Sequence, residues 1–143
     1  MHNVAEGLHS LLTEISPLIL DPKNAKSHNE RSISSIAESL SQFTQRKPII
    51  VQKSTNIVIA GNGTLQAAQS LGWSQIAALF VDDDQAKATA YAIADNKTAE
   101  LSEWDEDALG AALKFLQEET DTDYLGATGF SVDELDKWLP GVL

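Results

Sequence analysis

Val58-Ile59-Ala60-Gly61-Asn62-Gly63-Thr64-Leu65-Gln66-Ala67-Ala68 is the most informative stretch of this sequence. Its apolar start, from Ile57 to Ala60, predicts a buried strand, and a helical pattern begins at Thr64. The two glycines between them predict a tight turn, after which the first amides of the helix have no partner inside the helix. Such amides, together with the positive end of the helix dipole, stabilise an anion such as a phosphate.

A second interpretation of the same stretch stays open. A strand, Gly-x-Gly and a helix also occur wherever a tight turn packs a helix on a sheet, and the spacing alone favours that interpretation. Two nucleotide-binding motifs are excluded. No third glycine completes the dinucleotide fingerprint, and no Gly-Lys-Ser/Thr completes a P-loop.

The length of 143 residues predicts one compact domain with a buried core. The chain has no cysteine, which excludes disulfides and thiolate chemistry. No apolar run approaches the ~20 residues that cross a bilayer. The N-terminus lacks the basic segment followed by an apolar core that is typical of a signal peptide, so we expect none. We therefore expect a cytoplasmic protein with no membrane association.

Acidic residues outnumber basic ones by 21 to 10, which gives a net charge of -11. Because DNA binding depends largely on Lys and Arg, this charge would repel a duplex at long range. The charge is unevenly placed: residues 82–143 hold 16 acidic residues and 4 lysines, and residues 1–81 hold 5 acidic and 6 basic residues. The part that carries the two glycines is therefore near neutral, and an anionic ligand is electrostatically permissible there.

Two helices are expected before the glycines. Leu8, Leu11, Leu12 and Ile15 have helical spacing and predict a short amphipathic helix that Pro17 ends. Residues 17–20 are compatible with a strand. Ser32 is a suitable N-cap for the second helix. The expected buried face of that helix consists of Ile33, Ile36, Leu40 and Phe43.

The segment around the glycines predicts strands on both sides. Residues 48–51 and 57–60 read as a hairpin with Pro48 at the first position of its first strand. The helix after the glycines is expected to end at Gly72 as its C′ residue. Residues 76–81 predict a third strand.

The acidic second half predicts further helices. Asp82-Asp83-Asp84 invites a metal hypothesis, but adjacent side chains point in different directions, so capping of a helix to about Asn96 is favoured. The expected buried face of this helix consists of Ala86, Ala90, Ile93 and Ala94. Trp104-Asp105 starts another helix, residues 118–122 read as an acidic linker, and Ser131 to Glu134 form a capping box for a last short helix.

With these elements in order, the chain resembles the ParB/sulfiredoxin-like superfamily, specifically the ParB-like N-terminal domain, over about Leu18 to Trp104. The motifs that carry the resemblance are Asp21-Pro22-Lys23-Asn24 with His28, Gln45-Arg46-Lys47-Pro48-Ile49, and the glycine stretch itself. A further set is similar to the type fused to the front of phage DNA-modification methyltransferases. That set is Ile93-Ala94-Asp95-Asn96-Lys97, Glu100-Leu101, Trp104-Asp105 and Thr128-Gly129-Phe130-Ser131 with Glu134-Leu135.

The resemblance implies an α+β fold, in which helices pack on a small mixed sheet and a helical C-terminal extension follows. The expected organisation is an N-terminal helix in residues 1–17, the ParB/sulfiredoxin-like domain in residues 18–104 and the extension in residues 105–143.

The resemblance also implies a pocket for a nucleoside triphosphate, CTP or ATP, with Mg²⁺. By position, the phosphate loop consists of Gly61, Asn62, Gly63 and Thr64. The opposite wall consists of Asn24, His28, Asn29 and Arg31, and Lys47 is a further source of charge. Asp95 and Asn96 match an acidic-Asn pair that holds Mg²⁺ and phosphate in the partition proteins. Asp95 and Glu30 are the candidate catalytic residues.

Three departures from the family bear on activity. Thr64 stands where many relatives have arginine, so a fixed charge on the phosphates is missing. Sulfiredoxin chemistry needs a cysteine beside the loop and is excluded. The kinase branch has a catalytic glutamate after its first strand, where this chain has Asn24. No strong general base is evident beside the loop, so we expect slow hydrolysis or none.

The leading hypothesis is a nucleotide-binding, DNA-associated regulatory module of a phage or mobile element. One alternative is a metal-dependent ParB-like nuclease, for which Asp95, Glu30 and Glu100 are the available carboxylates. Another is a non-catalytic acidic domain that partners a DNA methyltransferase. A homodimer is compatible with the resemblance.

Overall fold

The computed structural model describes residues 2–24, 26–119 and 124–140. The chain divides into two compact units, Met1–Leu101 and Ser102–Leu143, here called the N-terminal unit and the C-terminal unit. None of the helices in the described ranges has the length and apolar character needed to cross a bilayer.

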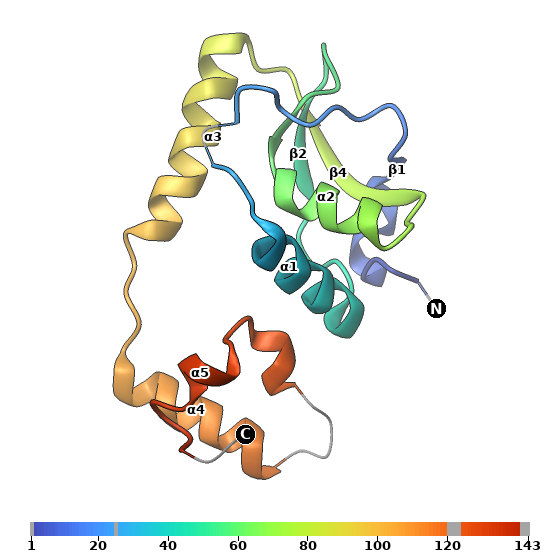
Figure 1. Ribbon diagram of the computed structural model, residues 1–143. Coiled ribbons are helices and arrows are strands. Elements are labelled where there is room, and N and C mark those ends of the chain that lie inside the picture. The colour runs from blue at the N-terminus through green and yellow to red at the C-terminus, as the bar shows by residue number, and fades with distance from the viewer. Residues whose placement is uncertain (1, 25, 120–123, 141–143) are drawn as a thin grey trace. The chain divides into compact units, whose positions relative to one another are not determined.

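The N-terminal unit is built on a mixed sheet whose described strands are ordered β1-β4-β2-β3 (Figure 1). The strands are β1 (Leu12–Glu14), β2 (Ile49–Gln52), β3 (Val58–Ala60) and β4 (Gln75–Val81). β4 pairs antiparallel with β1 and parallel with β2, and β2 pairs antiparallel with β3. The expected hairpin and third strand are confirmed, and so is the α+β class with a small mixed sheet.

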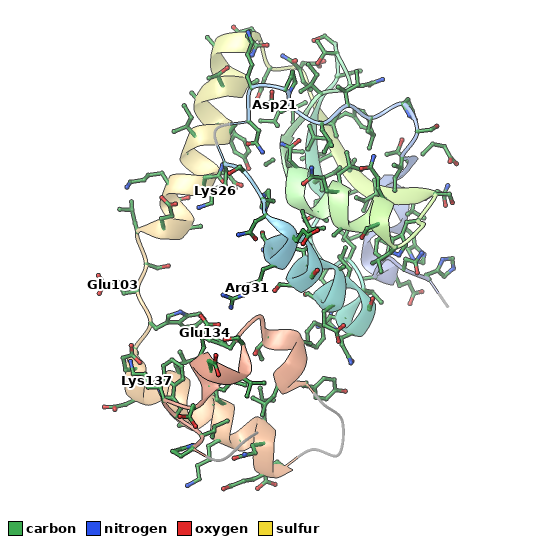
Figure 2. The ribbon with its side chains drawn as sticks, in the orientation of Figure 1. Asp21, Lys26, Arg31, Glu103, Glu134 and Lys137 are labelled. Carbon is green, nitrogen blue, oxygen red and sulfur yellow. The ribbon has the colours of Figure 1, made fainter. Side chains whose placement is uncertain are left out.

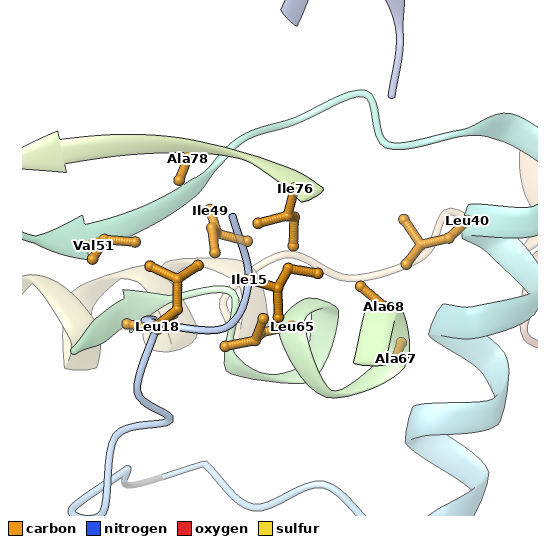
Figure 3. Packing of buried hydrophobic residues seen from close by; sticks show 11 residues of the cluster. Ile15, Leu18, Leu40, Ile49, Val51, Leu65, Ala67, Ala68, Ile76 and Ala78 are labelled. Atoms are coloured by element: carbon orange, nitrogen blue, oxygen red, sulfur yellow. The ribbon is translucent and has the colours of Figure 1, made fainter. Parts of the chain in front are cut away.

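Two helices, α1 (Glu30–Phe43) and α2 (Asn62–Ser70), complete the core of this unit. Apolar side chains of the strands meet those of α2, as Figure 3 shows for Val51, Ile76 and Leu65, which are 0% exposed. α1 packs against α2. Full burial of each such side chain contributes about 1.5–3 kcal/mol to folding. The core thereby fixes the helix that follows the glycines against the sheet.

The prediction of an N-terminal amphipathic helix is wrong. The structure has a short 3₁₀ helix, η1 (Glu6–Leu11), and from Leu12 the chain becomes strand β1, paired with Ala77 of β4. The helical spacing of the leucines was misleading because Ile15 is buried in the sheet core instead. Residues 17–20 form no named strand, and Ile19 makes an isolated parallel bridge to Ile57.

The helix α3 (Gln85–Glu100) begins as expected, with Asp84 as N-cap accepting a hydrogen bond from the Lys87 amide at 2.8 Å. It runs one turn past Asn96. Its predicted buried face is wrong: Ala88 is buried, and the expected set is exposed. The exposed set is Ala86, Ala90, Ile93 and Ala94. The pattern failed because α3 packs beside β3 rather than along the sheet face.

The C-terminal unit contains α4 (Glu106–Glu119), η2 (Leu125–Thr128) and α5 (Val132–Leu135) around a core that includes Leu113, Leu135 and Leu139. The predicted capping box is confirmed: Ser131 Oγ accepts from the Glu134 amide, and a Glu134 carboxylate oxygen accepts from the Ser131 amide. Of the predicted acidic linker, Glu118 and Glu119 end α4, and residues 120–122 lie outside the described residues.

Candidate functional site

A cleft of ≈ 840 Å³ lies in the N-terminal unit beside the glycine turn. Ligand pockets of proteins have volumes of about 300–1,000 Å³. Its described walls come from five places: residues 24–28, the C-terminal half of α1, residues 44–50, residues 59–64 and the middle of α3. The lining includes Asn24, Lys26, His28, Leu40, Phe43, Arg46, Lys47, Ile50, Gly61, Asn62, Gly63, Thr64, Tyr91, Asp95 and Asn96.

Close packing explains both glycines of the turn. Gly61 has φ +98, and a Cβ there would lie 2.5 Å from Ile49 Cγ2. A Cβ on Gly63 would lie 2.6 Å from His28 Cε1 and 2.8 Å from Ile36 Cδ1. The tight-turn interpretation therefore explains why both positions are glycine. It leaves room for the anion-binding interpretation, because the same turn faces the cleft.

The first turn of α2 carries the amides of Asn62, Gly63 and Thr64. Gly61 is the N-cap and supplies no side-chain hydrogen bond, and the regular helical bonds start with the Leu65 amide donating to the Gly61 carbonyl at 2.9 Å. No side chain in the described part of the chain caps these amides, and their residues line a cleft at the positive end of the helix. This geometry suits an anion.

The Asn62 side chain has a structural role in this turn. It is 7% exposed, its Oδ1 accepts a hydrogen bond from the Asp21 amide at 2.9 Å, and its Nδ2 donates to the Val58 carbonyl at 3.1 Å. It thus ties the segment after residue 20 to the first residue of β3. Asn62, a residue of the predicted phosphate loop, can offer a ligand its main-chain groups. Its side-chain amide already makes two hydrogen bonds within the protein.

The wall opposite the loop contains two of its four predicted residues, Asn24 and His28. The His28 ring lies against Gly63, and its Nδ1 is 2.7 Å from Ser32 Oγ. A titratable ring therefore stands beside the loop, which the sequence interpretation had not placed there. Asn24 bonds within its own segment, its Nδ2 donating to the Lys26 carbonyl at 2.6 Å.

The other two residues of that predicted wall do not line the cleft. Asn29 is the N-cap of α1, and its side chain accepts from the Ser32 amide at 2.8 Å, so Ser32 is not the cap that the sequence suggested. Arg31 and the candidate catalytic residue Glu30 lie in the first turn of α1, outside the lining residues.

The α3 wall contains Asp95 and Asn96, as expected by position. Asn96 Nδ2 donates to the Ala92 carbonyl at 3.0 Å. Over the described ranges, no three His, Cys, Asp or Glu side chains converge to hold a metal ion. One carboxylate suits Mg²⁺ only when substrate phosphates supply further oxygen ligands. Asp95 fits that arrangement.

Among the residues that the structure describes, three cationic side chains line the cleft, and of these only Lys47 was predicted to belong to the site. Lys26 enters beside α3, and Arg46 folds back over Phe43, its Nε donating to the Phe43 carbonyl at 2.8 Å. The sequence could not place them because the cleft brings together segments that are far apart in the chain. The apolar end of the cleft, with Leu40, Phe43 and Pro48, was missed for the same reason.

The ParB N-terminal domain family matches residues 6–97. The probable chromosome-partitioning protein ParB of Campylobacter jejuni is 33% identical over 87 residues, which are 59% of this chain and 31% of that protein. The chain thus spans about a third of the length of that relative.

Two solved structures from Caulobacter crescentus are similar. C-terminally truncated ParB complexed with CTP-γ-S has a TM-score of 0.75 at 18% identity, covering 90% of this chain and 75% of that one. The same protein complexed to the centromeric parS site has a TM-score of 0.51 at 17% identity, covering 90% and 69%. At these identities the likeness shows a shared fold.

Proposed function

This chain belongs to the ParB N-terminal domain family, and from that premise we propose that its cleft binds a nucleoside triphosphate together with Mg²⁺. CTP is the first candidate and ATP the second. The protein would act as a DNA-associated regulatory module of a phage or mobile element. The support for CTP is the fold shared with a ParB structure that is complexed with CTP-γ-S.

One observation carries the proposal: the uncapped first turn of α2 lines a cleft large enough for a nucleotide. The amides of Gly63 and Thr64 and the helix dipole provide the phosphate site. Lys26, Arg46 and Lys47 supply the positive charge that a phosphate needs, in place of an arginine at position 64. The apolar end between Phe43 and Ile50 suits the nucleobase.

Mg²⁺ would neutralise the phosphates, with Asp95 as its protein ligand on the α3 wall. The chemistry of hydrolysis would need a positioned water and a base. His28 lies beside the loop, where its Nδ1 is engaged with Ser32 Oγ and its Nε2 lies close against Gly63. We therefore propose binding with slow turnover or none.

The nuclease alternative gains no support from these positions. Glu100 pairs with Lys26, Asp95 lines the cleft, and Glu30 lies outside the lining residues.

Calorimetry with CTP, ATP and GTP in the presence of Mg²⁺ tests the proposal. Gly63→Val is a poor probe, because its side chain would displace His28 and Ile36. Thr64→Glu places a negative charge in the first turn of α2, where it favours the helix and repels a phosphate. We expect at least about tenfold weaker binding, equivalent to one charge-assisted hydrogen bond or more.

Gln69→Glu is the matched control: it makes the same charge change on the exposed end of the same helix, away from the cleft. It should bind like the native protein. If the native protein gives no heat of binding with any of the three nucleotides, the proposal is refuted.

The C-terminal unit supports a second candidate function, association with a basic partner such as a DNA methyltransferase. Residues 102–143 contain 11 acidic and 2 basic residues, a net charge of -9, and Trp104 is 66% exposed. This charge disfavours direct contact with a duplex by that unit. Co-purification of the methyltransferase with the full chain at low salt, its loss at high salt and its absence with residues 1–101 alone would support the idea.

A further inference from the structure

Lys26 is a cleft residue that no motif assigned. It lies between the turn at Pro22 and the start of α1 (Figure 2). Like Asn24, it lines the cleft. Its Nζ is 2.8 Å from Glu100 Oε1, at the end of α3, 74 positions away in the chain. This cationic residue of the cleft is thus already paired with a carboxylate of α3.

Glu100 stands one helical turn after Asn96, so both lie on the same side of α3. Asn96 and Asp95 line the cleft, which places Glu100 at its edge. The carboxylate is therefore positioned where it competes for Lys26 with any phosphate that enters from the glycine turn.

Building on the proposed nucleotide site, we propose that Lys26 is a phosphate-binding residue and that Glu100 is an internal competitor which holds Lys26 while the cleft is empty. Triphosphate binding would exchange one ion pair for another, Lys26 leaving Glu100 for a phosphate oxygen. The strength of the competing pair would then set how tightly an anion binds.

The strength of the pair fits such an exchange. Both side chains are about half exposed, 48% for Lys26 and 52% for Glu100. Pairs of this exposure are weak and screened by salt, so a multiply charged phosphate can displace the carboxylate. Hydrogen bonding and charge from Lys26 lower the pKa of Glu100 below its ordinary value, so the carboxylate is ionised near neutral pH.

Calorimetric titration with CTP and Mg²⁺ of three full-length variants tests the exchange. Glu100→Gln removes the competitor and should tighten binding by up to about fivefold, the range that an exposed ion pair allows. Lys26→Met should weaken binding by about five- to tenfold. The double variant should bind like Lys26→Met within about twofold, because the glutamate matters only while the lysine is present.

Glu38→Gln is the matched control for charge, since Glu38 is an exposed carboxylate of the same unit that does not line the cleft. It should leave the affinity unchanged. An equal gain with Glu38→Gln, or a full gain from Glu100→Gln in the Lys26→Met background, would show a general charge effect and overturn the exchange.

A second readout separates this inference from the proposed function. The side-chain carboxyl ¹³C signal of Glu100 should move on nucleotide addition toward its position in Lys26→Met. Native protein that binds no nucleotide defeats the proposed function. Native protein that binds nucleotide while this signal stays still, and Glu100→Gln binds as the native protein does, defeats the exchange alone.

Discussion

Three buried amide side chains, Gln45, Gln52 and Asn62, connect segments that are distant in the sequence. Gln45 bonds main-chain groups of Ala77, Gln52 donates to the Asp83 carbonyl, and Asn62 accepts from the Asp21 amide. Nothing in a single sequence distinguishes such a residue from a solvated one. The glycine turn was predictable because its signal is local, whereas the bonds of these three side chains depend on tertiary contacts.

Gln45 allows a sharp test of this role. It is 1% exposed, its Nε2 donates to the Lys47 and Ala77 carbonyls at 2.9 and 3.0 Å, and its Oε1 accepts from the Ala77 amide at 2.8 Å. Gln45→Leu leaves these groups buried without partners and should lower the free energy of unfolding by at least about 3 kcal/mol. Urea denaturation measures it, and Gln42→Leu on the exposed side of α1 should change little. Equal midpoints for the two variants would contradict the role.

Gly61 and Gly72 separate backbone strain from close packing. Both have positive φ, +98 and +77, but only Gly61 has neighbours within 4 Å of an added Cβ. Gly72→Ala should therefore cost only the left-handed conformation, about 1–2 kcal/mol. Gly61→Ala also pushes on Ile49, which adds about 1–3 kcal/mol. Thermal and urea denaturation of both variants should rank Gly61→Ala as the less stable, and the reverse order would refute the packing argument.

At the scale of the element, helices and strands set by residues close in the sequence were predicted, and those set by distant partners were not. The β2–β3 hairpin, the cap of α3 at Asp84 and the capping box of α5 are specified by neighbouring residues, and they were predicted. β1 and the exposed face of α3 were not, because β1 forms by pairing with β4, a partner more than sixty positions later. The apolar face of α3 looks buried in sequence and has no covering element among the described residues of its unit.

The corrected orientation of α3 predicts a contrast between two neighbouring alanines. Ala88 is 5% exposed and Ala90 is exposed. Ala88→Glu buries a carboxylate and should destabilise the protein by more than about 2 kcal/mol. Ala90→Glu keeps a good helix former in water and should stay within about 0.5 kcal/mol of the native protein. Chemical denaturation of both variants decides it, and similar losses would restore the original buried face.

For the whole molecule, the two units differ most in charge. The N-terminal unit has 10 acidic and 8 basic residues, and the C-terminal unit has 11 and 2. The composition of the sequence already showed this imbalance. The residues that line the cleft, by contrast, had to be found in the folded unit, where they run from Asn24 to Asn96.

This distribution predicts the behaviour of a shortened chain. Residues 1–101 contain the whole lining of the cleft and a core of their own. In calorimetry at physiological salt they should bind CTP within about threefold of the full chain, because salt at that strength weakens the repulsion of an anion by exposed carboxylates of the C-terminal unit. At low salt the fragment should bind more tightly than the full chain. Loss of binding in a folded fragment, verified by circular dichroism, would place part of the site beyond residue 101.

The strand order has a consequence for synthesis on the ribosome. The central strand β4 is the last of the four to be translated, and it bridges β1 to the β2–β3 hairpin. A nascent chain that has emerged only as far as the glycine turn therefore exposes an unfinished sheet, and such non-local pairing is slow to form. The sheet is complete only after residue 81 and the cleft only after residue 96, so translation speed between the codons for residues 64 and 81 would govern how long the unfinished sheet is open to chaperones.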